Sequence, residues 1–111
     1  MTDSREVARR ANEIEDELGL NLDAVLHKLT QEVGEFNDAV QKFRGIYCKK
    51  PHETLEPVIG ELGDLYFNLI SVCHRLGIDV AELPAYGAVT LEKFEERIHL
   101  YRASLDNSKN I

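Results

Sequence analysis

Four carboxylates stand at a spacing that could build a metal site. Glu32 and Glu35 are three residues apart in one stretch of the 111-residue chain. Glu61 and Asp64 repeat the same spacing in another stretch. Residues three apart on a helix are neighbours, so each stretch presents a pair of acids on one face. Four converging acids repel one another unless a cation is present. An all-oxygen set suits Mg²⁺, with Mn²⁺ as second choice, and indicates metal-dependent phosphate chemistry.

The surroundings of these acids leave an ordinary explanation open as well. Glu-x-x-Glu is common on the helices of soluble proteins, where such acids form a solvated face. Three glycines interrupt the same two stretches, namely Gly34, Gly60 and Gly63. Each glycine costs about 1 kcal/mol relative to alanine inside a helix. Glycine at such positions indicates either the close approach of a backbone or ligand, or tight packing between helices.

Helices must position these residues. Apolar residues recur at helical spacing along the chain, and no alternating pattern typical of a strand occurs. We therefore expect an all-α fold with four main helices, over about residues 3–18, 22–44, 53–76 and 90–104. Asp3 and Asn21 are predicted N-caps, and a glycine follows each of the first three helices. The capping-box spacing that begins at Asp79 predicts one short turn, which Pro84 ends.

Each of the two central helices carries an apolar stripe, and the acids lie on its polar flank. On the first the stripe is Leu22, Val25, Leu26, Leu29, Val33, Phe36, Val40 and Phe43, and on the second it is Leu55, Val58, Ile59, Leu62, Leu65, Tyr66, Leu69, Ile70, Cys73 and Leu76. A short connection requires antiparallel packing, so the two acid pairs can face each other. Helices this long in so small a domain leave apolar surface uncovered, and we expect a helical bundle that forms a homo-oligomer.

Composition narrows the classes of protein that remain. The net charge is −7, from 20 acidic and 13 basic residues, which argues against nucleic acid as a partner. No stretch approaches about 18 apolar residues, so we expect no membrane span. The charged N-terminus lacks the apolar segment of a secretory signal, and two cysteines make no disulfide framework. We expect a single domain over residues 1–111, in the cytoplasm, with both thiols reduced.

Three segments taken together resemble a known family. They are KLTQEVGEFNDAV at 28–40, IGELGDLYFNLISVCHRLGID at 59–79 and EKFEERI at 92–98. They are similar to the MazG-like all-α nucleoside triphosphate pyrophosphohydrolases, whose pattern is Glu-Glu-x-x-Glu, a spacer, and Glu-x-x-Asp. The resemblance covers about residues 20–100. It implies a Mg²⁺-dependent hydrolase for nucleotide-pool house-cleaning, which converts a nucleoside triphosphate to the monophosphate and pyrophosphate. It also implies a helical bundle built as a homodimer or homotetramer.

Carried over position by position, the resemblance implies roles for eight residues. The Mg²⁺ ligands are Glu32, Glu35, Glu61 and Asp64, of which Glu35 and Glu61 are also catalytic candidates, and the substrate contacts are Lys28, Asn68, Lys93 and Arg97. Asn68 follows Asp64 by one helical turn. Lys93 and Arg97 match the family's C-terminal basic pair. The resemblance implies that they contact the phosphates of a substrate bound to the same or to a neighbouring subunit. Lys28 could instead form an i, i+4 ion pair with Glu32.

One position departs from the family pattern. Gln31 stands where the family has the first Glu of the pair. An amide can donate or accept hydrogen bonds but cannot act as a base. The number of metal ions and the identity of the general base, for which Glu35 is one candidate, therefore stay open, as do the base and sugar preference.

Other functions fit parts of the pattern. A phosphoribosyl-ATP pyrophosphohydrolase would have similar chemistry on a histidine-pathway substrate. A non-enzymatic helical dimerisation or adaptor module would use the acidic face as a docking surface. A di-iron bundle needs Glu-x-x-His on two helices. This spacing occurs once, from Glu96 to His99, which disfavours a di-iron site.

Overall fold

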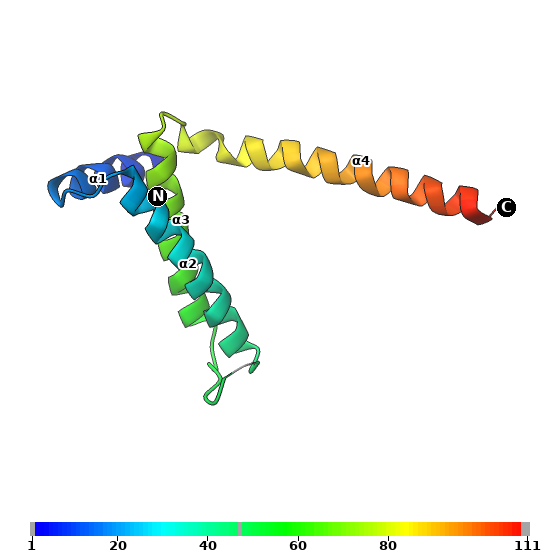
Figure 1. Ribbon diagram of the computed structural model, residues 1–111, viewed down its shortest axis with the longest axis horizontal. Coiled ribbons are helices and arrows are strands. Elements are labelled where there is room, and N and C mark those ends of the chain that lie inside the picture. The colour runs from blue at the N-terminus through cyan, green and yellow to red at the C-terminus, as the bar shows by residue number, and fades with distance from the viewer. Residues whose placement is uncertain (1, 47, 110–111) are drawn as a thin grey trace. The chain divides into compact units, whose positions relative to one another are not determined.

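The computed structural model describes residues 2–46 and 48–109 and shows helices joined by short connections (Figure 1). The helices are α1 (Ser4–Glu17), α2 (Leu22–Phe43), α3 (Glu56–Arg75) and α4 (Leu83–Lys109), with a 3₁₀ turn η1 (Val80–Glu82) before α4. The described residues contain no strand. The predicted all-α fold with four main helices is confirmed.

The predicted helix ends are set by local chemistry. The Asp3 side chain accepts a hydrogen bond from the backbone N–H of Arg5, and the Asn21 side chain accepts one from Ala24 at 2.9 Å. Both N-caps satisfy a backbone donor that has no partner inside the helix. Left-handed glycines follow the first three helices, with φ of 72° at Gly19, 73° at Gly45 and 77° at Gly77. Any other residue would be strained there.

Two predicted boundaries were wrong, both near a proline. α3 begins at Glu56 rather than 53, with Pro57 in its first turn. α4 covers Leu83–Lys109 instead of 90–104, and Pro84 lies inside its first turn rather than ending a separate one. The first backbone N–H groups of a helix have no partner within it, so a proline costs nothing there.

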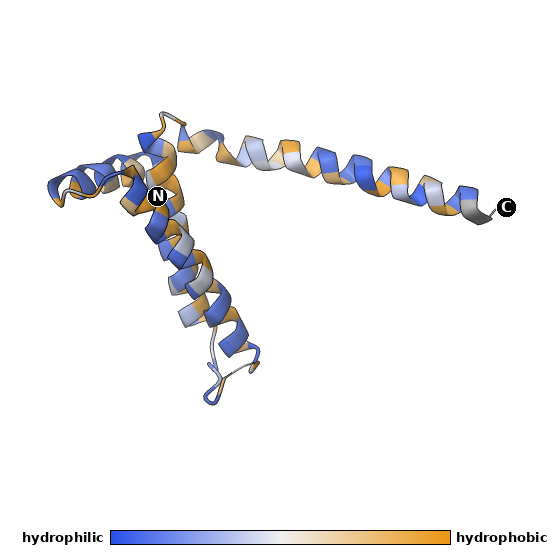
Figure 2. Cartoon of the chain, viewed as in Figure 1, coloured by the Kyte–Doolittle hydropathy of each residue, from blue (hydrophilic) through white to orange (hydrophobic). Residues whose placement is uncertain are grey.

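The contacts within the chain define two compact units, residues 1–80 and 81–111. In the first unit, α2 and α3 lie side by side and run in opposite directions, and α1 packs against α3 (Figure 1). The predicted antiparallel arrangement of the central helices is thus confirmed. The second unit consists mainly of α4, along which apolar segments recur between polar ones (Figure 2). The single domain over residues 1–111 stays a prediction.

The face of α2 that is buried in the first unit lies at the polar edge of the predicted apolar stripe. Val25, Glu32 and Ala39, each seven residues apart, are buried, whereas Val33 of the stripe is 52 % exposed. On α3, Leu62 of the stripe is likewise 48 % exposed. Among the helices of this unit α2 packs against α3 alone, so a stripe this wide keeps one edge uncovered.

Both cysteines, Cys48 and Cys73, are free thiols. Among the described residues, no helix combines the length and the hydropathy needed to cross a bilayer.

Candidate metal centre

Three of the four predicted ligands converge between α2 and α3. One oxygen each of Glu32, Glu61 and Asp64 lies within 4.8 Å of the other two. Glu32 is buried, Glu61 is half-buried and Asp64 is exposed. Because α2 and α3 are antiparallel, acids from separate stretches of sequence meet at one level of the helix pair. We refer to these three residues as the acid group.

Glu35 lies at the edge of the acid group. It is exposed and does not belong to the set within 4.8 Å. It nevertheless interacts with both neighbours, because hydrogen bonding and charge repulsion from Glu35 contribute to a raised pKa of Glu32 and of Glu61. Gln31 is exposed as well. Glu35 is therefore close enough to act together with the acid group, although it is not part of its centre.

The negative charges of the four acids repel one another. Burial is the main cause of the raised pKa of Glu32, followed by hydrogen bonding and repulsion from Glu35. Burial is also the main cause of the raised pKa of Glu61, followed by the charges of Glu35 and Asp64. Within the described residues, no lysine, arginine or histidine forms an ion pair with any of these four acids. The described part of the chain therefore provides no ion pair that compensates the negative charge of these acids.

Two carboxylate oxygens of the acid group have no donor. Oε2 of Glu32 and Oε2 of Glu61 are buried and accept no hydrogen bond. A buried polar atom without a partner costs about 1–3 kcal/mol, so such atoms are rare in folded proteins and call for an explanation. A divalent cation would satisfy both oxygens and neutralise the repulsion. The all-carboxylate donor set fits Mg²⁺ or Mn²⁺, which prefer oxygen ligands.

The glycines beside the acids do not mediate helix packing within the chain. A Cβ atom placed on Gly34, Gly60 or Gly63 would meet no atom within 4 Å. Tight helix packing, one of the two explanations that the sequence left open, is therefore not seen at these glycines among the described residues. All three glycines are exposed, and the space next to them is open.

A cavity of about 380 Å³ adjoins the acid group. It is lined by Glu32 and Asp64, by the polar side chains Glu15, Lys28 and Asn68, and by the apolar side chains Ala11, Ile14, Leu18, Leu20 and Phe67. The volume lies in the usual range for small-molecule sites, and so does the combination of apolar walls with a few polar groups. α1 supplies much of the apolar wall, which the sequence patterns had not indicated.

Two of the predicted substrate contacts lie on this cavity. Asn68 is buried, and its side-chain N–H donates to the backbone carbonyl of Asp64 at 2.8 Å. Lys28 is exposed, and among the described residues it makes no ion pair with Glu32. The alternative interpretation of Lys28 as an i, i+4 partner of Glu32 is thus not supported.

The other two predicted contacts, Lys93 and Arg97, belong to α4. Both are exposed, and the Arg97 guanidinium lies 5.4 Å from the centre of the Phe94 ring. They belong to the unit formed by residues 81–111, whereas the acids belong to the unit formed by residues 1–80. Their contact with substrate stays a prediction.

A buried polar cluster on the cavity wall escaped the sequence analysis. Glu15 of α1 is 7 % exposed and accepts hydrogen bonds from Ser71 and Arg75 of α3. Asn12 donates to the Ser71 backbone carbonyl and to its hydroxyl, both at 3.1 Å. The available signal was that Glu15 follows the apolar residue Ala11 by four positions, and so lies on the same face of the helix.

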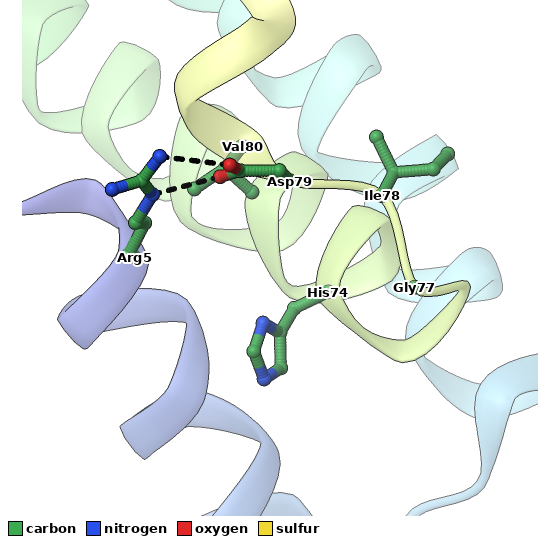
Figure 3. A pocket seen from close by; sticks show the side chains of 6 residues that line it. All are labelled: Arg5, His74, Gly77, Ile78, Asp79 and Val80. Carbon is green, nitrogen blue, oxygen red and sulfur yellow. Dashed lines mark hydrogen bonds and ion pairs between the residues drawn. The ribbon is translucent and has the colours of Figure 1, made fainter.

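A second cavity, of about 360 Å³, lies where α1 begins and α3 ends (Figure 3). Arg5 donates to both carboxylate oxygens of Asp79, at 2.9 and 2.8 Å, and His74 and Val80 also line the space. The paired charges hold the start of α1 against the segment after α3. We assign this cavity a structural role.

Comparison with known proteins identifies a domain family that matches most of the chain. The sequence model of the MazG nucleotide pyrophosphohydrolase domain matches residues 20–99, well over half of the chain. The match contains α2 and α3 with all four acids, and it leaves α1 outside. Comparisons with curated proteins and with solved structures gave no match.

Proposed function

The chain belongs to the MazG nucleotide pyrophosphohydrolase domain family, and on this premise we propose that it is a Mg²⁺-dependent nucleoside triphosphate pyrophosphohydrolase. The products would be the nucleoside monophosphate and pyrophosphate. The observation that carries the proposal is the pair of buried oxygens without donors, Oε2 of Glu32 and Oε2 of Glu61, within the acid group. A merely solvated acidic face would not bury such atoms, because water would supply the missing hydrogen bonds.

Glu32, Glu61 and Asp64 would hold the ion, with Glu35 beside them. When bound, Mg²⁺ would supply positive charge against the phosphate oxygens. The carboxylates fix the position of that charge, and their own repulsion is relieved at the same time. The open space next to Gly60 and Gly63 leaves room for a triphosphate at this surface.

The general base would be a carboxylate at the edge of the acid group. Glu35 is exposed and near the acids, so an oxygen of Glu35 can accept a proton from an attacking water molecule. The water oxygen forms the new bond to a phosphorus atom next to the α–β bridging oxygen. The bond from that phosphorus to the bridge breaks, and pyrophosphate and the monophosphate separate. Glu61 is the alternative base, because its carboxylate belongs to the acid group that faces the phosphates in this pose.

The nucleoside would occupy the 380 Å³ cavity. Ile14, Leu18 and Phe67 offer apolar surface to a flat base, while Asn68 and Lys28 line the same cavity together with two of the acids. In this pose the polyphosphate extends from the cavity over the acid group. Lys28 is then placed to neutralise phosphate charge.

A second copy of the chain would complete the assembly, as a homodimer or homotetramer. The support comes from large apolar side chains that are exposed in both units. The exposed fraction is 43 to 62 % for Ile59, Leu62 and Tyr66 of α3 and for Phe94 and Ile98 of α4. Large apolar side chains exposed in such number are typical of surfaces that bind another protein. Lys93 and Arg97 would reach phosphate groups from the same copy or from a neighbouring one.

A panel of nucleotides tests the proposed activity. Canonical and modified nucleoside triphosphates, together with phosphoribosyl-ATP, are incubated with the protein and Mg²⁺, and pyrophosphate and orthophosphate are measured separately. We expect pyrophosphate from nucleoside triphosphates and none without the metal. Cleavage of phosphoribosyl-ATP alone would favour the histidine-pathway enzyme. No turnover, with no calorimetric binding of Mg²⁺ or nucleotide, would favour the adaptor.

A further inference from the structure

The Glu15 carboxylate is held rigidly inside the first unit. Its Oε1 accepts from Nε and Nη2 of Arg75, at 3.2 and 3.0 Å, and from Asn12 at 3.4 Å. The hydroxyl of Ser71, which is fully buried, lies 2.6 Å from Oε1 and 2.8 Å from Oε2. With contacts from both sides, the carboxylate cannot change orientation without breaking several bonds.

Its second oxygen has unused acceptor capacity. A carboxylate oxygen can accept two hydrogen bonds. Among the described residues, the Ser71 hydroxyl is the one donor to Oε2, and its single hydrogen atom is shared with Oε1. Oε2 therefore has at least one lone pair without a donor, on a side chain that is 7 % exposed.

Glu15 is one of the residues that line the cavity that we assign to the nucleoside. Glu15 shares the cavity with Ile14, Leu18 and Phe67 and with two of the acids, Glu32 and Asp64. An occupant that suits such walls has a flat apolar body and an N–H donor. An occupant with a carbonyl oxygen in the same place would face two acceptors against each other and leave Oε2 without a partner.

We infer that Glu15 makes the protein select nucleobases that carry an exocyclic amino group, as cytosine and adenine do, over uracil and hypoxanthine, which carry a carbonyl there. The inference rests on the proposed function, because that function assigns the cavity to a nucleoside. It concerns this chain in particular, since Glu15 lies outside residues 20–99 that match the family.

Binding of monophosphates tests this selection without relying on turnover. Calorimetry gives the dissociation constants of CMP against UMP and of AMP against IMP. We expect the amino-bearing nucleotide of each pair to bind about 10- to 100-fold more tightly. In Glu15→Gln, an amide can also donate to a carbonyl oxygen, so both ratios should fall to about 1.

Asp16→Asn is the matched control. Asp16 follows Glu15, carries the same charge and also pairs with Arg75, at 3.1 Å, but it is exposed and does not line the cavity. We expect its binding ratios to equal those of the wild type. If Glu15→Gln does not fold by circular dichroism, Glu15→Asp keeps the charge and withdraws the oxygens by one methylene, and the ratios should again drop.

Several results would overturn the inference. They are equal affinities for CMP and UMP in the wild type, a wild-type ratio retained in the folded Glu15 variant, and no binding of any monophosphate. A change in Glu15→Gln that affects the ratio of CMP to dCMP, and not that of CMP to UMP, would assign Glu15 to the sugar instead. Absence of pyrophosphate release with an intact binding ratio would refute the proposed activity alone.

Discussion

The hydroxyl of Ser71 on α3 lies 2.6 Å from Oε1 of Glu15 on α1, and both side chains are buried. With Arg75 they form a polar cluster between these two helices. Such a cluster does not necessarily stabilise a fold more than apolar residues of the same size would, because burial removes the charges from water. It does make the fold sensitive to the loss of one member.

Removing the positively charged side chain of Arg75 should therefore lower the stability of the fold. Arg75→Ala leaves the Glu15 carboxylate buried without its charged partner, and we expect the free energy of unfolding to drop by about 3–5 kcal/mol. Arg10→Ala is the control, because Arg10 pairs with Glu13 on the surface and should cost less than about 1 kcal/mol. Urea unfolding measures both values. Equal losses in the two variants would show that the buried cluster does not anchor α1.

Neutralising Glu32 should have the opposite effect on the metal-free protein. Glu32→Gln removes a charge that repels Glu35, Glu61 and Asp64. We expect a gain of about 1 kcal/mol in the free energy of unfolding, and a rise in Tm of about 4–8 °C. We expect Mg²⁺ to raise the Tm of the wild type and to leave the Tm of Glu32→Gln unchanged.

Asp38→Asn provides the comparison for that variant. Asp38 is an acid on the same helix that pairs with Lys42 at 2.9 Å on the surface. Its substitution should change the Tm little and leave the Mg²⁺ response intact. A Glu32→Gln protein that is destabilised, or that still responds to Mg²⁺, would remove Glu32 from the metal centre.

The raised pKa values of Glu32 and Glu61 predict a dependence on pH with a definite sign. Each folded-state pKa lies above the ordinary value of 4.5, so the folded metal-free protein binds protons more tightly than the unfolded chain. This contribution to stability must fall as the pH rises from 4.5 through the raised pKa, and then level off. Mg²⁺ binding needs the deprotonated carboxylates, so its affinity should rise over the same interval.

Thermal unfolding from pH 4.5 to 8, with and without Mg²⁺, measures this effect. The difference in Tm between wild type and Glu32→Gln isolates the contribution of the acids from that of other groups. We expect the variant's advantage without metal to grow with pH. An advantage that is constant, or that shrinks as the pH rises, would contradict the assignment of the pKa shifts.

The local pattern predicted the helices well but could not define which face is buried. Asp3, Asn21 and the glycines at 19, 45 and 77 act within one or two turns, so their effect is readable from the sequence. Burial of Glu32 beside exposed Val33 depends instead on which surface another helix covers. A helical wheel places the apolar stripe inside, whereas in residues 1–80 the polar edge faces α3.

The positions of the acids in the site were predictable from the sequence, whereas the cavity beside them was not. The i, i+3 spacing of the acids indicated that Glu61 and Asp64 share a face, and the short connection placed them opposite Glu32. The wall of the cavity was not predictable, because Glu15 and Phe67 come from helices whose packing no local signal defines. The sequence did not indicate the open space beside Gly34 either, because that space depends on how the helices pack.

The exposed apolar residues of α3 and α4 predict self-association that depends on them. Leu62→Glu on α3 and Phe94→Glu on α4 place a charge at positions that are 48 % and 57 % exposed. We expect the wild type to sediment as a homodimer or homotetramer and each variant to shift towards the monomer, with unchanged helical circular dichroism. Asn37→Glu, at an exposed polar position of α2, should leave the assembly as it is. A wild-type protein that sediments as a monomer would refute this prediction.

The central claim is that the acids between α2 and α3 hold a divalent ion that acts on a triphosphate. Mg²⁺-dependent release of pyrophosphate by wild type and by Glu61→Gln tests it most directly. We expect the variant to keep its helical circular dichroism and to lose the release of pyrophosphate. Turnover in Glu61→Gln equal to that of the wild type would contradict the claim.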